Sequence, residues 1–404
     1  MVEKKYLRTY APNKIFMKRP VPGFLFVLFL LVKSAYAQTD SVCNLRISIL
    51  TCSPGQELYS LFGHSALRIT DLDAKTDIIY NWGTFEGYGD PDFYIKFMRG
   101  KLRYYVSPDK LNDFMYEYQY DGRSVIEQVL ALSCEDKRKI KNAVDSNMLP
   151  DNRYYKYDFT LDNCTTRIRD LIENNSSSLK LPKHIVKDGT TFRNMLHSYL
   201  DKGSQPWSKL GIDILLGARL DNKVTANEAL FLPEYLMTAM DSTTQNNKPI
   251  IQSSNLLLNA QPYEEMKGIY EPLIMFTSIC LLFFLISLSK NAVAVKITHL
   301  IDTMLLYTTG LIGMLLLFMW FFTDHAACAN NYNLLWALPT NFIVAFAWKR
   351  PAWTKQYFKF MAGISILTVV SWFLLPQQLN IALLPLEIYM LYRYAKLFSA
   401  KNRL

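Results

Sequence analysis

The spacing of apolar and polar positions divides the chain into three parts. The first part, residues 1–37, contains one apolar run, 22–32, which follows Lys18 and Arg19 and precedes the small-x-small sequence at 35–37. A basic segment, an apolar run of about ten residues and such a sequence are typical of a secretory signal peptide. We therefore expect residues 1–37 to be a signal peptide. The alternative is a short N-terminal anchor, although a membrane-spanning helix needs roughly 20 residues.

The second part, residues 38–240, alternates short apolar runs with polar turns. Alternating or apolar runs predict strands at 45–50, 66–70, 78–82, 104–106 and 125–130. Helical spacing predicts helices at 134–147, 163–174, 191–200 and 226–240. This mixture predicts an α+β domain, with helices beside an antiparallel sheet. Residues 241–271 follow as a linker, which is polar at 241–254.

The third part, residues 272–404, holds five apolar runs, at 272–289, 298–322, 334–348, 360–375 and 380–395. Lys and Arg occur near residues 290–296, 349–359 and 393–403, whereas the segments 323–333 and 376–380 contain neither. Because Lys and Arg collect on the cytoplasmic side of a membrane, this pattern predicts five transmembrane helices, with the preceding domain outside. Together with the signal peptide, it predicts a membrane protein whose domain at residues 38–240 is exported.

Two acidic residues, Asp302 and Glu387, fall inside these apolar runs. An ionisable side chain within a membrane is costly and is therefore a candidate functional group. We expect Asp302 to be solvated near the membrane surface. For Glu387 a structural and a functional role both remain open.

Charge is distributed unevenly along the 404 residues, whose formal net charge is +9. The net charge is +6 for residues 1–37, −4 for residues 38–271 and +7 for residues 272–404. The basic excess therefore lies beside the apolar runs, where it fits export and membrane topology. We expect no nucleic-acid partner, since the exported part carries no basic excess.

One cysteine stands in a sequence that suits a nucleophile. Cys164 follows Asp162 and Asn163, which are typical helix N-caps, and helical apolar spacing begins directly after it. Free N–H groups and the helix dipole at a first turn favour an anion, so they lower the pKa of a thiol. Because the thiolate is the reactive form, Cys164 is a candidate for covalent catalysis. The alternative is an inert buried cysteine.

His64 is the candidate partner of this cysteine. It begins a predicted strand directly after Gly63, in a sequence rich in glycine and aromatic residues. A lone histidine is usually structural, but a histidine can exchange protons near neutral pH because its ordinary pKa is about 6.5. Its role therefore depends on whether the fold brings it to Cys164.

The order of a histidine strand, further strands and a cysteine helix resembles the circularly permuted papain-like hydrolases and acyltransferases, which include lecithin:retinol acyltransferase and NlpC-type proteins. More closely, the chain resembles the Lnb N-terminal periplasmic domain family at residues 62–68, 80–85, 157–169 and 231–233. His325 and residues 331–336 resemble the membrane half of the same family. The resemblance covers nearly all of residues 38–404. It implies a permuted papain-like α+β fold in which Cys164 and His64 are catalytic.

The resemblance also implies lipoprotein N-acylation at the outer face of the inner membrane. In that reaction Cys164 takes an acyl chain from a membrane phospholipid as a thioester. The α-amine of the N-terminal diacylglyceryl-cysteine of a lipoprotein then receives the chain, while His64 moves the protons. The implied partners are a phospholipid donor, a diacylated lipoprotein acceptor and the membrane itself. This chemistry needs no cofactor.

A third group is expected to orient His64. Asn81, on the next strand, is the expected residue, by analogy with a Cys-His-Asn arrangement. Asp158 and Glu57 are rivals for this role. The alternative for Asn81 is a plain position at the edge of the sheet.

Other residues are candidates for binding. The oxyanion hole is expected to use the backbone N–H of Cys164, with the neighbouring side chain of Asn163. Arg68, on the same strand face as the histidine, could meet a phosphate or a carboxylate, or form a surface salt bridge. His325, in the expected outer loop, could place a lipid headgroup or line the route to the site, or be a plain interfacial residue.

The remaining cysteines carry less information. A disulfide between Cys43 and Cys52 is possible in an oxidising compartment, and Cys134 is expected to be a buried helix residue. No Cys-x-x-Cys or His-Glu-x-x-His spacing occurs, so we expect no metal site.

Two other functions fit the same sequence. A membrane-tethered cell-wall peptidase or amidase would use the same Cys-His pair with water as the acceptor. A non-catalytic envelope receptor or chaperone would use Cys164 only as a structural residue.

Overall fold

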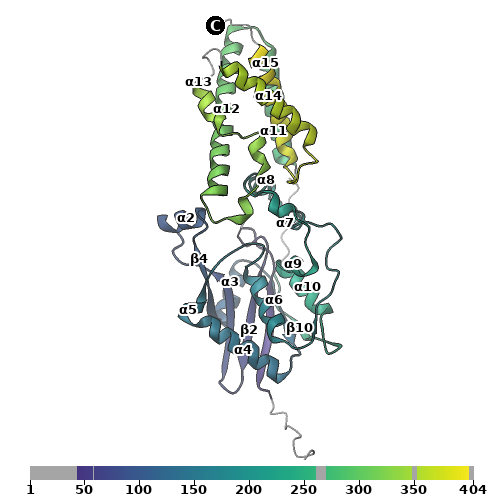
Figure 1. The fold of residues 1–404 in the computed structure, drawn as a ribbon. Helices are drawn as coiled ribbons and strands as arrows, with labels where there is room; N and C mark the ends of the chain where they lie inside the picture. The colour runs from purple at the N-terminus through teal and green to yellow at the C-terminus, as the bar shows by residue number, and fades with distance from the viewer. Residues whose placement is uncertain (1–42, 58, 261–269, 348–352, 400–404) are drawn as a thin grey trace, which may run out of the picture. The chain divides into compact units, whose positions relative to one another are not determined.

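The computed structural model describes residues 43–57, 59–260, 270–347 and 353–399. Residues 44–404 group into one compact unit. Within this unit a sheet domain precedes a helical domain, whose first helix begins at Glu271 (Figure 1). The expected signal peptide lies outside the described residues.

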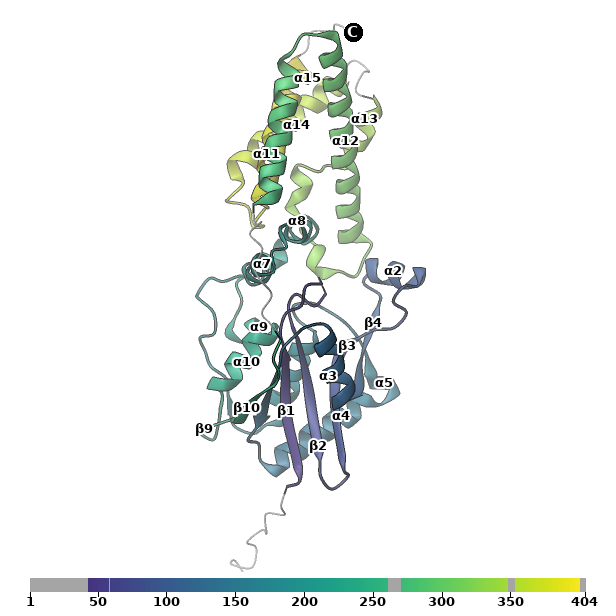
Figure 2. The same ribbon diagram turned by 180° about the vertical axis from the view of Figure 1, so that it is seen from behind.

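A seven-stranded antiparallel sheet forms the centre of the first domain (Figure 2). Its strands are, in spatial order, β10 (Ile251–Leu258), β5 (Val125–Leu130), β1 (Leu45–Cys52), β2 (His64–Asp71), β3 (Thr76–Thr84), β4 (Arg103–Lys110) and β6 (Tyr154–Lys156). Each of the five segments predicted as strands lies within one of them. Three short strands, β7 (Leu179–Lys180), β8 (Thr244–Gln245) and β9 (Lys248–Pro249), form a second sheet.

The segment predicted as a linker contributes a strand instead. Residues 251–258 form β10, which pairs with β5 from Ile251 opposite Leu130 to Leu258 opposite Val125. Most side chains of β10 are exposed, so backbone hydrogen bonds rather than an apolar face hold it at the sheet edge. A polar edge strand of this kind has no apolar period that the sequence could reveal.

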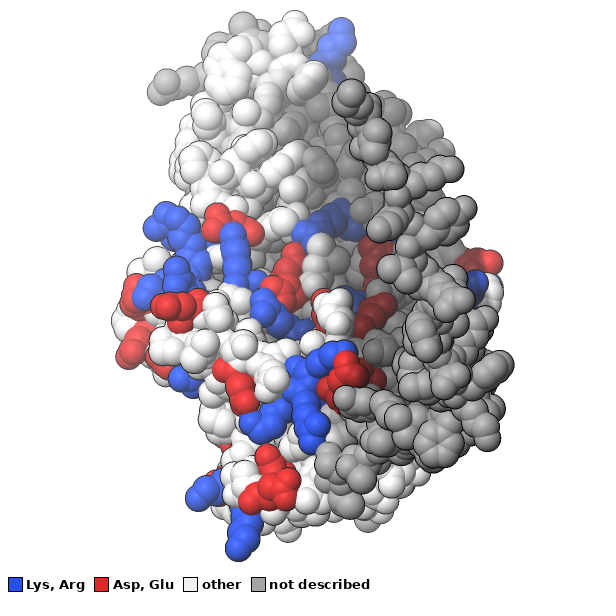
Figure 3. All heavy atoms as spheres, turned by 60° about the horizontal axis from the view of Figure 1, so that its bottom comes forward, with Lys and Arg blue, Asp and Glu red and all other residues white. Residues whose placement is uncertain are grey.

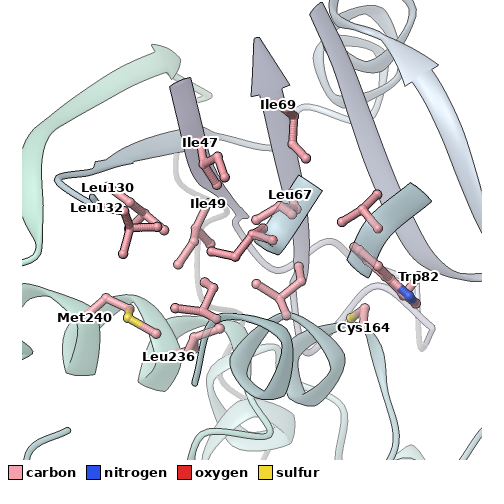
Figure 4. Close-up of a cluster of buried hydrophobic side chains, with 14 of the residues drawn as sticks. Ile47, Ile49, Leu67, Ile69, Trp82, Leu130, Leu132, Cys164, Leu236 and Met240 are labelled. Carbon is pink, nitrogen blue, oxygen red and sulfur yellow. The ribbon is translucent and has the colours of Figure 1, made fainter. Parts of the chain in front are cut away.

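Helices cover both faces of the sheet. They are α2 (Pro91–Met98), α3 (Leu111–Tyr120), α4 (Cys134–Met148), α5 (Pro150–Arg153), α6 (Cys164–Asn175), α7 (Phe192–Lys202), α8 (Pro206–Leu215), α9 (Ala226–Ala229) and α10 (Pro233–Ser242). On one face, residues of α4, α6 and α10 pack against Ile47, Leu67 and Trp82 (Figure 4). On the opposite face, Phe114 of α3 packs against Ile79. Each fully buried side chain of this size contributes about 1.5–3 kcal/mol.

One expected helix is divided in two. The sequence predicts a single helix over 226–240, whereas the structure has α9, which ends at Ala229, and α10, which begins at Pro233. Proline fits the first turn of a helix but not its interior, because it lacks an N–H and fixes φ. Pro233 therefore starts a new helix.

The second domain consists of five helices joined by short segments. They are α11 (Glu271–Leu288), α12 (Ala292–Phe321), α13 (Thr340–Ala347), α14 (Trp353–Ser371) and α15 (Leu384–Ser399). Among the described residues, α11 and α12 are long and apolar enough to cross a membrane. The expected run at 334–348 is split into a 3-10 turn at Tyr332–Leu335 and α13, with Pro339 between them. The five-span topology remains a prediction.

The two acidic residues of the apolar runs are both buried in this domain. The expectation that Asp302 is solvated is wrong, since it is 3% exposed on α12. Its carboxylate accepts two hydrogen bonds of 2.7 Å from Arg393 on α15. Ion pairing is what makes a buried charge tolerable. Glu387, also on α15, is 1% exposed.

The cysteine pairing differs from the expected one. Cys52 is a buried free thiol, as are Cys164, Cys280 and Cys328. Cys43 and Cys134 are the disulfide-bonded cysteines. A Cys43–Cys52 bridge is therefore excluded, because Cys52 ends β1 as a free thiol within the apolar cluster beside α3.

Charges of both signs mix on the surface of the sheet domain. Figure 3 shows acidic and basic side chains interspersed over the described part of the face seen from below in Figure 1. The described part of this face therefore has no extended field of one sign. Elsewhere on the sheet, Arg46 and Arg68 share the buried carboxylate of Glu127, and Arg68 also pairs with Asp77.

Candidate active site

His64 is the first residue of β2, and the backbone directly before it requires a glycine. Gly63 has a φ of +79°, and a Cβ there would lie 2.8 Å from the carbonyl oxygen of Cys52. Both facts exclude larger residues without rearrangement. The close approach sets His64 opposite Cys52 in the β1–β2 register, at the end of the sheet.

A chain of hydrogen bonds fixes the orientation of the imidazole. The side-chain nitrogen of Asn81 on β3 donates to Asp109 on β4. A carboxylate can only accept, so the amide nitrogen of Asn81 must face Asp109 and its oxygen must face His64. That oxygen lies 3.0 Å from Nε2 of His64. Nε2 is therefore the protonated nitrogen, which leaves Nδ1 of neutral His64 as the basic atom.

Cys164 lies at the first helical position of α6, at the margin of the apolar cluster (Figure 4). Asn163 caps this helix by accepting from the N–H groups of Thr165 and Thr166, both at 2.9 Å. Thr166 completes a capping box, since its hydroxyl accepts from the N–H of Asn163 at 2.8 Å. The cap fixes where the helix begins and therefore where the thiol stands.

The thiol is poised to ionise near neutral pH. Burial opposes its ionisation, but the charge of His64, hydrogen bonding from His64 and the N–H of Ser65, and Thr165 outweigh burial. Together they lower the pKa of Cys164 from 9.0 to about 7. The hydroxyl of Thr165 lies 3.7 Å from Sγ and 3.1 Å from the hydroxyl of Ser65, so β2 and α6 are joined beside the thiol.

The pKa of His64 shifts in the opposite direction, upward. Burial lowers the pKa of His64, but the charge and hydrogen bonding of Cys164 and the hydrogen bond to Asn81 raise it above its ordinary value. A lowered thiol pKa and a raised imidazole pKa both favour a thiolate–imidazolium pair. Such a pair is a nucleophile with its proton donor already in place.

Asn163 is excluded as a side-chain donor to an oxyanion. Its amide nitrogen already donates to the carbonyl oxygens of Phe159 and Phe231, at 2.8 and 2.9 Å. Its oxygen is used by the helix cap, and the residue is 3% exposed. The backbone N–H of Cys164 stands at a helical position that has no intrahelical acceptor, so it is the donor that the helix offers.

Arg68 is also held away from the site. It forms a bidentate ion pair with Asp77, at 2.7 and 2.8 Å, and a third bond of 3.0 Å to Glu127. All three of these groups lie on the sheet, and the second carboxylate is almost fully buried. Arg68 thus forms the salt bridge that the sequence offers as an alternative, and three of its five N–H donors are used by carboxylates.

Asp158 and Glu57 are the alternatives to Asn81 for orienting His64, and both have other partners or surroundings. Asp158 accepts from Thr160 and Leu161, which forms the turn before α6, and it pairs with Arg219 at 3.0 Å. Glu57 is exposed on the segment before β2. Within the described residues, the side chain bonded to Nε2 of His64 is Asn81.

His325 joins the two domains rather than standing free in a loop. Its Nε2 donates to the carbonyl oxygen of Phe97 at the end of α2, at 2.8 Å. Its neighbour Asp324 donates its N–H to the carbonyl of Arg99 and pairs with Lys156 at 2.8 Å. The loop after α12 is therefore tied directly to the sheet domain.

A second buried polar cluster was not predicted from the sequence. Arg193 of α7 is fully buried and donates to Asp213 of α8 at 2.7 Å. Asp213 also meets His197 at 2.8 Å and Asn380, from the segment between α14 and α15, at 2.8 Å. Polar residues on short helices usually mark solvent-exposed faces, so the spacing alone gives no sign of this cluster.

Side-chain amides from the membrane domain extend this second cluster. Asn331, Asn333 and Gln377 donate to backbone carbonyls at the end of α8, at distances from 2.8 to 3.3 Å. These residues belong to the segment 331–336 that the resemblance singles out and to the segment 376–380.

No metal centre competes with the Cys-His site. Over the ranges that the structure describes, no three His, Cys, Asp or Glu side chains gather in a way that could hold a metal ion.

Comparison with known families identifies both domains. The Lnb N-terminal periplasmic domain matches residues 33–198, and the Lnb transmembrane domain matches residues 264–403. The chain belongs to the Lnb family. It is thus a membrane protein with a periplasmic domain, and His64, Asn81 and Cys164 all lie within the match to the Lnb periplasmic domain. No curated protein and no solved structure matches the chain.

Proposed function

We propose that this Lnb-family protein is a lipoprotein N-acyltransferase of the bacterial inner membrane that works through a Cys164 thioester. The observation that carries the proposal is the Cys164–His64–Asn81 arrangement, in which the cysteine and the asparagine are buried, on a chain whose C-terminal part is a membrane domain. A thiol with a pKa of about 7 is a strong nucleophile at physiological pH. A membrane domain keeps that nucleophile beside substrates that do not leave the bilayer.

In the first half-reaction, the Cys164 thiolate attacks the ester carbonyl carbon of a phospholipid. The oxyanion that forms is stabilised by the backbone N–H of Cys164 at the start of α6. As the ester C–O bond breaks, Nδ1 of His64 gives its proton to the departing glycerol oxygen. The products are a thioester on Cys164 and a lysophospholipid, and His64 is left neutral.

In the second half-reaction, the α-amine of a diacylglyceryl-cysteine attacks the thioester carbonyl. Neutral His64 accepts a proton from the amine as the C–N bond forms. The C–S bond then breaks and the thiolate leaves. The product is an amide on the lipoprotein, and the thiolate–imidazolium pair is restored without any cofactor.

Asn81 is a positioning residue in this cycle. Its oxygen accepts from Nε2 of His64 in both charge states, so Nδ1 faces the thiol throughout. Asp109 holds the amide in this direction.

For this function we propose that the membrane domain crosses the membrane five times. Helices α11–α15 would carry Lys and Arg on the cytoplasmic side and hold the sheet domain in the periplasm. The sheet domain would have the permuted papain-like arrangement, with the histidine on β2 before the cysteine on α6.

Mass spectrometry of lipoprotein N-terminal peptides tests the proposal. In cells that carry Cys164→Ala as their sole copy, we expect free α-amines to replace N-acylated termini. Cys280→Ala, which removes another buried free thiol, is the matched control and should leave N-acylation intact. Unchanged N-acylation in the Cys164→Ala strain would refute the acyltransferase function.

A second measurement distinguishes transfer from hydrolysis. Purified protein mixed with phospholipid vesicles should gain the mass of one acyl chain, and Cys164→Ala should not. Addition of a diacylated lipopeptide should move that mass to the peptide. Release of free fatty acid at the same rate with and without the peptide would show hydrolysis of the lipid ester instead of transfer. Absence of any acyl-enzyme and of any fatty acid would leave the peptidase or amidase class as the alternative.

A further inference from the structure

An apolar surface surrounds α2 and is open to its surroundings. The α2 surface, as defined here, consists of Tyr88, Tyr94, Ile95, Phe97 and Met98, which are between 48% and 77% exposed. The last four lie within one helix of eight residues, whose Phe93 alone is buried. Monomeric soluble proteins rarely expose a continuous patch of large apolar side chains, so such a patch marks a contact surface.

The α2 surface is fastened to the end of a candidate membrane span. The carbonyls of Phe97 and Arg99 accept hydrogen bonds from His325 and from the N–H of Asp324, at 2.8 and 2.9 Å. Gly100 has a φ of +65°, and a Cβ there would lie 3.1 Å from the backbone of Asp324, so the two segments touch. This loop directly follows α12, and both views place α2 beside that end of α12 (Figures 1 and 2).

The end of α12 is itself apolar and open. Phe321 and Phe322, its last residue and the next one, are 64% and 71% exposed. The α2 surface therefore continues the apolar surface of a helix that is long enough to cross a membrane.

Aromatic rings connect the α2 surface to the nucleophile. Phe85 contacts Phe93 of α2, with ring centroids 5.4 Å apart, and Tyr104 on β4, at 5.6 Å. Tyr104 in turn lies 4.6 Å from Tyr157. Each step is an ordinary aromatic contact.

The last step of this path runs past Gly83. A Cβ built on this glycine would lie 3.6 Å from the ring of Tyr157 and 4.0 Å from Cβ of Cys164. Gly83 therefore lies between the last ring and the nucleophile. Its φ of +96° explains the glycine, because other residues rarely adopt such a conformation.

Basic residues flank the apolar ones. Lys96 pairs with Asp92 of the same helix at 2.6 Å, and Arg99, Lys101 and Arg103 follow α2 with no acidic residue among them. Apolar side chains beside Lys and Arg are the composition of helices that lie in the interface of a membrane, where the cations meet lipid phosphates. Phosphate complementarity thus favours lipid over a protein partner.

We propose that α2 is an interfacial membrane helix, that its apolar surface lies in the outer leaflet next to α12, and that lipid acyl chains pass along Phe85, Tyr104 and Tyr157 to Cys164. The membrane contact of α2 stands on its own. The acyl path rests on the proposed acyltransferase function.

Depth-dependent quenching tests the membrane contact. An environment-sensitive fluorophore is attached to Ile95→Cys in full-length Cys164→Ala protein in phospholipid vesicles. Tyr120→Cys, at an 83% exposed aromatic position that ends α3, is the matched control. We expect lipids with a quencher on the acyl chain to remove most of the fluorescence at position 95 and little at position 120. Equal, weak quenching at both positions would overturn the membrane contact, and it would leave a protein partner as the occupant.

Donor competition tests the acyl path. For wild type, Ile95→Glu and Tyr120→Glu, the rate of Cys164 acylation is measured with a vesicle phospholipid and with a short-chain soluble ester. We expect the vesicle-to-soluble ratio to fall about tenfold in Ile95→Glu and to stay unchanged in Tyr120→Glu. An unchanged ratio in Ile95→Glu would refute the path. If wild type is acylated by neither donor, the acyltransferase function fails, whereas the quenching result still decides the place of α2.

Discussion

Two histidines of the periplasmic domain, the half-buried His64 and the buried His197, have different partners. His64 bonds to a neutral amide, Asn81, and faces a thiol with a lowered pKa. His197 bonds to a carboxylate, Asp213, at 2.8 Å, and this carboxylate also binds the fully buried Arg193. A neutral partner orients an imidazole without fixing its charge, whereas a carboxylate held by an arginine fixes the charges around it.

The carboxylate beside His197 belongs to a buried ionic cluster. Burial opposes ionisation of Asp213, but the hydrogen bonds and charges of His197 and Arg193 outweigh it and lower its pKa. The guanidinium of Arg193 donates to Asp213, to Asp221 and to the carbonyls that directly follow α8. At the Cys164 site, by contrast, a thiol with a lowered pKa faces an imidazole with a raised pKa.

The largest expected effect comes from replacing each histidine in turn. His64→Ala should lower kcat for acyl transfer by about 10⁴-fold, because the thiol loses its base. His197→Ala should change kcat by no more than about threefold while destabilising the fold by about 1.5–3 kcal/mol, because a charge-assisted hydrogen bond is lost. Acylation kinetics and denaturant unfolding in detergent measure the two effects. The comparison fails if His197→Ala lowers kcat per folded molecule as strongly as His64→Ala does.

The second expected effect concerns the carboxylate of the structural cluster. Asp213→Ala removes one of the two carboxylates that hold the fully buried Arg193 and leaves Asp221 as its remaining ionic partner, so the free energy of unfolding should fall by about 3 kcal/mol. Asp201→Ala is the control, since its pair with Lys209 is partly exposed and should be worth no more than about 1 kcal/mol. Equal midpoints for the two variants in denaturant unfolding would show that the buried cluster does not stabilise the fold.

A smaller effect is expected at the orienting amide. Asn81→Ala should lower kcat by about 10²-fold, because the ring of His64 is no longer held with Nδ1 toward the thiol. The pH profile should change as well, since the hydrogen bond that His64 donates to Asn81 helps to raise the pKa of His64. Asn255→Ala, on the exposed edge strand β10, is the control. A lower kcat with an unmoved profile would indicate a structural role for Asn81 instead.

The smallest expected change is the pH dependence of the thiol. The pKa of Cys164 is lowered to about 7, so alkylation by iodoacetamide should be half-maximal near pH 7 and fall about tenfold for each pH unit below it. In His64→Ala the lowering charge is gone while burial remains, so the midpoint should move toward or above the ordinary value of 9.0. Cys52, whose pKa burial raises to about 12, should stay unlabelled and serves as the internal control. A wild-type midpoint at that ordinary value would contradict the coupled pair.

Much of the periplasmic domain follows from its sequence, because its signals are local. The start of α6 at Cys164 and the strand at His64 depend on a cap residue and a glycine, both adjacent in the chain. Asn81 is expected beside His64 because neighbouring antiparallel strands bring such positions together, and the structure places it there.

The features that could not be predicted from the sequence depend on residues that are far apart along the chain. The donors of Asn163 are used by Phe231, which is 68 residues away, and no local pattern reveals that. The role of Asp109 depends on the β3–β4 register. Arg193 and Asp213 resemble the polar faces of ordinary helices, although the membrane-domain loops cover them.

The amides of Asn331, Asn333 and Gln377 hold α8 by its main-chain carbonyl groups. Every amino acid presents the same carbonyl, so these particular bonds tolerate many side chains on α8, whereas the Asp213 carboxylate, which Asn380 binds, and Leu210, which packs against Trp336, do not share that tolerance. Over evolutionary time, the exposed positions of α8 can change while the three amides, Asp213 and Leu210 keep this junction together. Homologues should therefore preserve the three amides more faithfully than the exposed residues of the helix that they hold.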